Sequence, residues 1–372
     1  LLLGLSSNLS RYLLLFLPLF AVTASFVSEH ALVAFVAPLM GGVYITATRA
    51  ARLEEDRALA LVLLLTVTMV GNLGGPGSPS AGGRNAVMLG ILKDYGTEPT
   101  YAEWVKYGLP FVPVAALAVG LYFLVVFRSR IKTTQVNIAA VVKEESRRLG
   151  PMLRNEYLMA GILLLVIAGW IGLSSTYGMA GPVLAGLVLM AMLRVVRWKD
   201  VSHIHWDVVF LYAGATALGA GLAVTGAGLW IANGLLGLLP EALSAGTGLA
   251  MAASLVTGIL TNFMSDGATV SALGPITVPS AIISGTHPWM VGLATAFASS
   301  FAHVLIIGTP NNAIVYAVAV DPDSGKRLIS LGDFAKHGLA VWLISFAVLW
   351  LWLFGVYWPW MGFPPIAPGP AG

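Results

Sequence analysis

Two short polar segments of this apolar chain carry the residue types that could bind ions. Ser28-Glu29-His30, the first tip, recurs 237 positions later as Ser265-Asp266-Gly267, the second tip, and flanking Phe, Ala, Val and Pro residues recur with it. A carboxylate within apolar sequence is costly and usually marks an ion or substrate site. Either acid would attract sodium or take up a proton. The candidate sodium ligands are Ser28, Glu29, Ser265 and Asp266.

A Gly- and Pro-rich stretch follows each tip. The first runs from Gly74 to Asn85, and the second is Gly308-Thr-Pro-Asn-Asn312, so that Asn85 aligns with Asn312. Glycine and proline interrupt helices and free backbone groups, which is tolerated at membrane depth where those groups line a cavity. Two kinks packed by small residues are the alternative, but recurrence after both tips favours a binding site. The candidate binding residues are Gly82, Asn85, Thr269, Gly308, Thr309, Pro310, Asn311 and Asn312.

The elements that must position these residues are membrane helices. Hydrophobic residues make up 58% of the chain and charged residues 10%, with a mean hydropathy of +0.85. Four long segments lack Asp, Glu, Lys and Arg, namely 157–193, 208–240, 267–320 and 337–372. Because about 20 apolar residues cross the hydrocarbon core, we expect an all-α polytopic protein of the cell membrane. The absence of cysteine excludes disulfides, thiolate metal sites and thiol catalysis.

Charge placement predicts how the helices are oriented. Residues 128–155 form a basic linker with seven Lys and Arg residues, which places it on the cytoplasmic side against anionic lipid without any need for nucleic acid. It separates a first repeat, 1–127, from a second, 156–372. The span 107–127 then runs inward and the span 338–357 outward. Opposite directions predict inverted repeats, each with a re-entrant helical hairpin and an interrupted helix, as in many secondary transporters.

The second repeat contains more helices than the first. Spans are expected near 157–172, 180–193 and 208–239, and all three precede the second tip. The first tip has no counterparts ahead of it, so we expect roughly 80 residues to precede Leu1 in the whole protein if the repeats match. His203-Ile-His205 is a weak candidate metal pair, and the neighbouring Trp198, Lys199 and Trp206 favour a place at the membrane interface.

These motifs resemble the divalent-anion/sodium symporter family of the ion-transporter superfamily, whose members carry dicarboxylates, citrate or sulfate. In that family each repeat has a hairpin tipped by Ser-Asn-Thr and a helix interrupted near Gly-Thr-Pro-Pro-Asn. Gly308-Thr-Pro-Asn-Asn312 is close to that pattern, and Gly74-Gly-Pro-Gly-Ser-Pro79 looks like the family's Gly-Gly-x-Gly-Thr-Pro. The resemblance covers the chain apart from the family's opening helices. It implies cation-coupled symport of a small anion, with sodium or a proton as coupling ion, and a homodimer.

The chain departs from the family pattern at the two tips. Glu29 and Asp266 replace tip asparagines that lie beside sodium and the substrate carboxylates. A dianion would be repelled by these acids unless they are protonated or paired with sodium, so the cargo could also be something other than a dianion. His30 could add positive charge or accept a coupling proton, or it could be a neutral histidine satisfied by backbone. Arg84, where the family has proline, could bind the anion, or it could snorkel to the interface.

Some features of the sequence are also found in proteins with other functions. The second tip also looks like the Asn-Asp-Gly-Ala tip of arsenite-efflux and sodium/proton-exchanger relatives in the same superfamily. An ion channel is a further alternative, because polar interruptions also build selectivity filters. An intramembrane enzyme is disfavoured, because neither Asp207 nor Asp266 has the Gly-x-Gly-Asp context of aspartyl proteases and no Gly-x-Ser-Gly motif is present. We expect the two tips to meet near the membrane midplane beside the interrupted helices.

Overall fold

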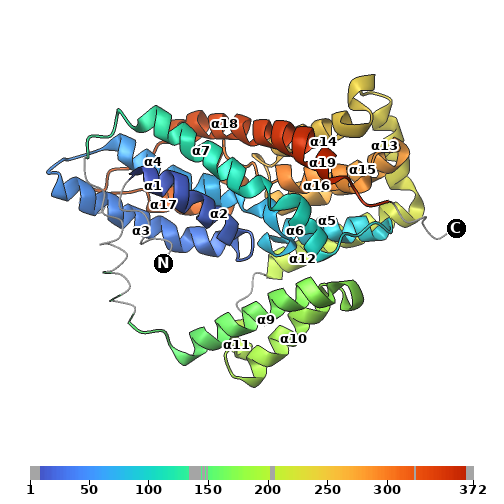
Figure 1. Ribbon diagram of the computed structural model, residues 1–372, viewed down its shortest axis with the longest axis horizontal. Helices are drawn as coiled ribbons and strands as arrows, with labels where there is room; N and C mark the ends of the chain where they lie inside the picture. The colour runs from blue at the N-terminus through green and yellow to red at the C-terminus, as the bar shows by residue number, and fades with distance from the viewer. Residues whose placement is uncertain are drawn as a thin grey trace.

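The computed structural model describes residues 9–133, 144, 147, 150–201, 206–321 and 324–365. Those residues form helices and turns, with one isolated bridge between Val320 and Arg327 and no strand, which confirms the all-α prediction. Figure 1 shows an elongated helical body with the α9, α10 and α11 segments beneath it.

The elements are α1 Leu9–Arg11, η2 Tyr12–Phe16, α2 Leu17–Ala24, α3 Glu29–Ala50, α4 Arg57–Leu73, η3 Gly75–Gly77, η4 Pro79–Ala81, α5 Gly83–Asp94, α6 Tyr101–Gly108, α7 Phe111–Phe127, α9 Arg154–Tyr177, α10 Ala180–Met192, α11 Trp198–Val201, α12 Trp206–Thr225, α13 Ala227–Leu236, η5 Glu241–Leu243, α14 Gly246–Leu260, α15 Asp266–Ile283, α16 Pro288–Ala298, η6 Ile306–Gly308, α17 Pro310–Val318, α18 Leu331–Ala347, η7 Val348–Tyr357 and α19 Trp358–Met361.

Five helical segments within the described residues are long and apolar enough to cross a membrane. They are 29–50, 57–77, 101–127, 154–174 and 331–361. The spans predicted at 107–127 and 338–357 lie within two of them. The region predicted as a span at 208–239 is apolar enough to cross a membrane but is not straight, because α12 and α13 meet there at an angle of 80°. Gly226 lies at the bend with a φ of +71°, the left-handed conformation that ends a helix and that glycine adopts without strain.

Helix α4 forms the centre of the packed body. Every residue from Leu59 to Leu73 is buried, and α4 packs against α2, α3, α7 and α17. Asp56 fixes its start, because one carboxylate oxygen accepts from the Leu59 amide at 3.1 Å. The other oxygen accepts from the Lys132 and Thr133 amides, at 2.9 Å each, which ties the chain after α7 to the same point. The core therefore holds the first interrupted helix rigidly up to its end.

Two helices are interrupted where the sequence predicts it. The first break, residues 74–82, separates α4 from α5, and the second break, residues 299–309, separates α16 from α17. Each helix that resumes after a break packs against the helix that begins in the tip of the other repeat. Helix α5 lies against α15, and α17 lies against α3. Since α3 begins in the first tip and α15 in the second, this packing brings both tips and both breaks to one place.

The crossing of α18 over the second break depends on the small size of a glycine. A Cβ atom at Gly338 would overlap the His303 carbonyl oxygen and lie 2.9 Å from the Val304 Cα. We expect Gly338→Ala to lower the free energy of unfolding by about 1–3 kcal/mol, the usual effect of overpacking. Gly332→Ala on the same helix is the matched control, because its Cβ would meet only the Ser330 hydroxyl at 3.7 Å. Unfolding in detergent, followed by tryptophan fluorescence, checks the difference, and equal stability of the two variants would contradict it.

Candidate functional site

The two tips are built in the same way around a serine. Ser28 is the N-cap of α3 and accepts from the Ala31 amide at 3.4 Å, and Ser265 is the N-cap of α15 and accepts from the Ala268 amide at 3.3 Å. A serine in this position satisfies an amide that the first helical turn leaves open. The acid that follows each serine therefore becomes the first residue of a helix. Sodium binding by the two serines stays a prediction.

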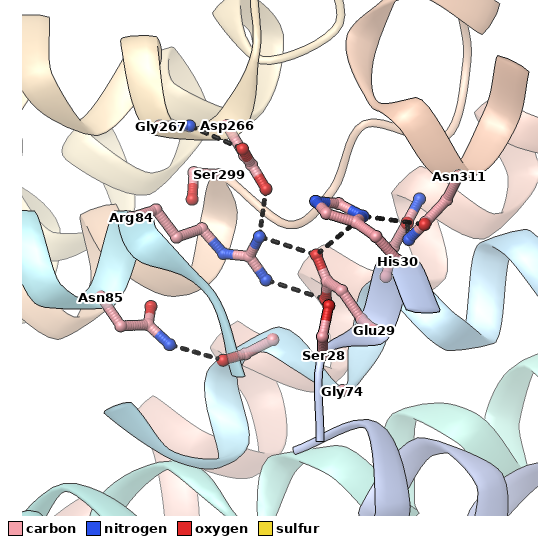
Figure 2. A network of polar contacts seen from close by, with 12 residues as sticks. Ser28, Glu29, His30, Gly74, Arg84, Asn85, Asp266, Gly267, Ser299 and Asn311 are labelled. Atoms are coloured by element: carbon pink, nitrogen blue, oxygen red, sulfur yellow. Dashed lines mark hydrogen bonds and ion pairs between the residues drawn. The ribbon is translucent and has the colours of Figure 1, made fainter. Parts of the chain in front are cut away.

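A buried arginine connects the two tips. Arg84, on the first turn of α5, donates to Glu29 Oε1 at 2.8 Å and to Glu29 Oε2 at 3.0 Å, and it also donates to Asp266 Oδ2. Figure 2 shows the guanidinium lying between the two carboxylates. The remaining Asp266 oxygen accepts from the Gly267 amide at 2.7 Å. The predicted meeting of the tips is thus observed, although the residue that links them, Arg84, lies on the first turn of α5, directly after the first break.

The triad Glu29–Arg84–Asp266 is shielded from solvent. Its exposed fractions are 2%, 1% and 8%, so the interpretation of Arg84 as a snorkelling cation is wrong. Two acids face one base, and the bidentate contact with Glu29 has the geometry in which guanidinium and carboxylate bind most strongly. A charge buried this deeply is strongly destabilising once its partner is removed. The triad therefore holds three separate elements together through charges that depend on one another.

Arg84 occupies most of the carboxylate oxygens that a cation between the tips would need. Glu29, His30 and Asp266 are the one group of potential metal ligands found in the described part of the chain, with ligand atoms within 4.8 Å of one another. Three of the four carboxylate oxygens, however, accept from Arg84, which carries only donors. Sodium at Glu29 and Asp266 does not fit while the guanidinium occupies this position.

His30 contacts the first turn of α17, directly after the second break, through a side chain. Its Nδ1 lies 2.8 Å from Asn311 Oδ1 and 4.0 Å from Glu29 Oε1. Asn311 in turn donates from Nδ2 to Asn72 Oδ1 at 2.7 Å. The alternative in which backbone satisfies His30 is therefore wrong. The sequence analysis did not single out Asn72 on α4. A polar amide near the end of the apolar run 59–73 could have marked it as a candidate.

The aligned asparagines that follow the two breaks donate the same pair of hydrogen bonds. Asn85 donates to the carbonyls of Gly75 and Ser78, both at 2.8 Å. Asn312 donates to the carbonyls of Ala302 and Leu305, at 2.7 and 2.8 Å. In both cases the acceptors lie 10 and 7 residues earlier in the chain. The two amides thus satisfy carbonyls that the breaks expose, and the alignment inferred from the sequence is confirmed as local structure.

A second matched pair joins each tip region to its own break. Ser25 donates to the carbonyls of Ala21 and Gly74, at 3.1 and 2.9 Å. Asn262 donates to the carbonyls of Gly258 and Phe301, at 2.8 and 3.4 Å. Ser25 and Asn262 are separated by the same 237 positions as the tips, so the repeat itself was the signal that could have found them.

The other predicted residues lie around this centre with different roles. A Cβ at Gly82 would come within 3.2 Å of Arg84 Nη1, and one at Gly308 within 2.7 Å of the Thr261 carbonyl, so both glycines permit close approach. Thr309 Oγ1 is buried and makes no hydrogen bond within the described residues. Pro310 is the first residue of α17. The Thr269 hydroxyl donates a hydrogen bond to the Ser265 carbonyl at 2.9 Å. His203 and His205 lie outside the described residues.

Comparisons with known proteins agree with this architecture. The sodium:sulfate symporter transmembrane region matches residues 3–363. Proteins named sodium-dependent dicarboxylate transporter SdcS are 25% identical over 307 residues in Staphylococcus saprophyticus and over 310 residues in Staphylococcus aureus. These matches include 77% of this chain, and the chain spans 57% of the length of each relative.

A solved structure has a similar fold. It is MtrF of Neisseria gonorrhoeae, which its description assigns to a class of antimetabolite efflux pumps, and the match covers 96% of this chain and 79% of MtrF with a TM-score of 0.51. At 13% identity this likeness concerns the fold alone. The family match, in contrast, covers almost the whole chain, and the matched relatives are transporters rather than enzymes. The chain therefore belongs to the sodium:sulfate symporter family and is a multi-pass protein of the cell membrane.

Proposed function

We propose that this protein is a secondary active transporter that moves a small anion, such as a dicarboxylate or sulfate, together with a cation. The observation that carries the proposal is the meeting of both tips at Arg84, a buried guanidinium at the point where the two interrupted helices cross. Guanidinium groups bind carboxylate and sulfate-like oxyanions through paired hydrogen bonds. Helices broken at such a crossing are the usual place for substrate in secondary transporters.

The repeats and the partners belong to the same proposal. Asn85 and Asn312 make equivalent contacts in the two halves of the chain, and so do Ser25 and Asn262. These equivalent contacts support two repeats, 1–127 and 156–372, joined by the linker 128–155. Their opposite orientation rests on the charge pattern alone. The similarity to sodium-dependent dicarboxylate transporters supports sodium as the coupling ion. A small anion and the lipid bilayer are the proposed partners, with a second copy of the chain in a homodimer.

Transport by the reconstituted protein tests the proposal. Uptake of succinate, citrate, sulfate and arsenite into liposomes would be measured under an inward sodium gradient, a proton gradient, or neither. We expect saturable uptake of one of the three anions, stimulated by the sodium gradient. Uptake of arsenite alone would favour the arsenite-efflux alternative, and flux that does not saturate would indicate a channel. Either result would overturn anion symport.

Thr309 is expected to contribute to anion affinity rather than to cation dependence. Its buried hydroxyl has no partner in the described chain and stands at the N-cap of α17, beside the contact between Asn311 and His30. Loss of one hydrogen bond of about 1.4 kcal/mol in Thr309→Val would raise the KM for the anion about tenfold. Thr46→Val, an exposed threonine on α3, is the control. An unchanged KM in Thr309→Val would show that this hydroxyl does not face the cargo.

A further inference from the structure

Within the triad, the two acids occupy the terminal nitrogens of the Arg84 guanidinium. Glu29 presents both carboxylate oxygens to two nitrogens of Arg84, at 2.8 and 3.0 Å. A free carboxylate anion would approach a guanidinium in the same side-on geometry. Glu29 and an incoming carboxylate therefore compete for the same N–H groups. Asp266 Oδ2 occupies a further position on Nη1. In the present structure the place of an anion is filled by the protein's own acids.

The three residues of the triad lie on different helices, yet they meet in one network of hydrogen bonds. The competition for the guanidinium therefore arises from the packing that brings α3, α5 and α15 together.

We propose that Arg84 binds the transported anion and that Glu29 and Asp266 hold it, when no cargo is bound, as internal stand-ins for the cargo's carboxylates. When the anion takes the guanidinium, the released acids become the ligands of the coupling cation. This inference rests on the proposed function and supplies the reason why anion and cation travel together.

The coupling follows from the charges of the buried triad. An anion that bound alone would leave two buried carboxylates without their guanidinium, and a buried charge without a partner is strongly unfavourable. A sodium ion that bound alone to the acids would lie beside an unpaired guanidinium. When both bind, the guanidinium pairs with the anion and the acids pair with sodium. Each ligand therefore raises the affinity for the other by the same factor, about 5- to 150-fold for couplings of usual size.

Equilibrium binding to the purified protein measures this factor directly. The dissociation constants of radiolabelled succinate, citrate and sulfate would be measured in sodium chloride and in choline chloride, and that of ²²Na⁺ with and without the anion that binds. We expect the anion to bind about 5- to 150-fold more tightly in sodium, and sodium to gain affinity by the same factor when the anion is present. Equal anion affinity in both salts would overturn the exchange of partners while leaving anion transport intact. If none of the three anions binds, the proposed function fails and this inference fails with it.

Variants of the triad separate the two halves of the proposal. Arg84→Met is expected to lose anion binding and to bind sodium without any anion, because the acids are already free.

Since the Arg84→Met variant leaves two buried acids unpaired and can fail to fold, Glu29→Gln is the second test. It removes a competitor and keeps Asp266 against Arg84, so anion affinity in choline should rise at least fivefold and the effect of sodium should shrink. Arg57→Met is the matched control, because Arg57 pairs with Asp333 at 2.8 Å on the exposed surface. Unchanged anion affinity in folded Arg84→Met, or in Glu29→Gln, would overturn the role assigned to the triad.

Discussion

Arg84→Met is expected to lower the free energy of unfolding by about 3–5 kcal/mol, the range typical of a buried ion pair that loses one partner. The arginine is 1% exposed and holds both Glu29 and Asp266, so its removal leaves two buried carboxylates uncompensated. The free energy of unfolding falls because two unpaired carboxylates stay buried, and not because the attraction between arginine and acids is gone. A triple variant with Arg84→Met, Glu29→Gln and Asp266→Asn should therefore recover most of it.

Unfolding of the purified protein in detergent would compare these two variants with the wild type. Arg57→Met provides the surface control, since exposed ion pairs contribute about 0–1 kcal/mol. Two results would contradict the argument. One is an Arg84→Met protein as stable as the Arg57→Met control, and the other is a triple variant that is less stable than Arg84→Met alone.

The parts of the site that the sequence could predict are those encoded by local patterns. Ser28 and Ser265 precede acids at the starts of helices, and capping acts within one turn, so the tips were recognisable from a few residues. The breaks were recognisable because glycine and proline leave backbone groups unpaired, and Asn85 and Asn312 satisfy those groups at short sequence distance. Apolar stretches of sufficient length likewise predicted the spans at 107–127 and 338–357.

The parts that could not be predicted depend on contacts between distant segments. Arg84 is 55 residues from Glu29 and 182 residues from Asp266, and nothing in Gly82-Gly-Arg-Asn85 distinguishes a buried arginine from one at the interface. Only the crosswise packing of α5 on α15 and of α17 on α3 brings these charges together. The bend at Gly226 had a local cause, but glycine is so frequent in this chain that its position alone did not identify the bend.

Gly75→Ala is expected to abolish anion uptake, because the guanidinium of Arg84 lies against the backbone of the first break at this glycine. A Cβ atom at Gly75 would overlap Arg84 Nη2 and would lie 2.5 Å from Ser300 Oγ and 2.7 Å from Arg84 Cζ. Its φ is not in the left-handed region, so this glycine is required for space and not for backbone conformation. The added methyl group would force the guanidinium away from Glu29.

The size of this effect follows from the hydrogen bonds that a displaced guanidinium can no longer make to the anion. Two charge-assisted hydrogen bonds contribute about 3 kcal/mol or more, and their loss lowers the rate of uptake at low anion concentration at least about a hundredfold. Gly41→Ala on α3 is the control, because no atom lies within 4 Å of the added Cβ. Size-exclusion chromatography would confirm that both variants fold. A folded Gly75→Ala protein with the uptake of the Gly41→Ala control would mean that Arg84 can leave the break without consequence, and the anion would then have to be bound by the backbone of the two breaks and by Thr309.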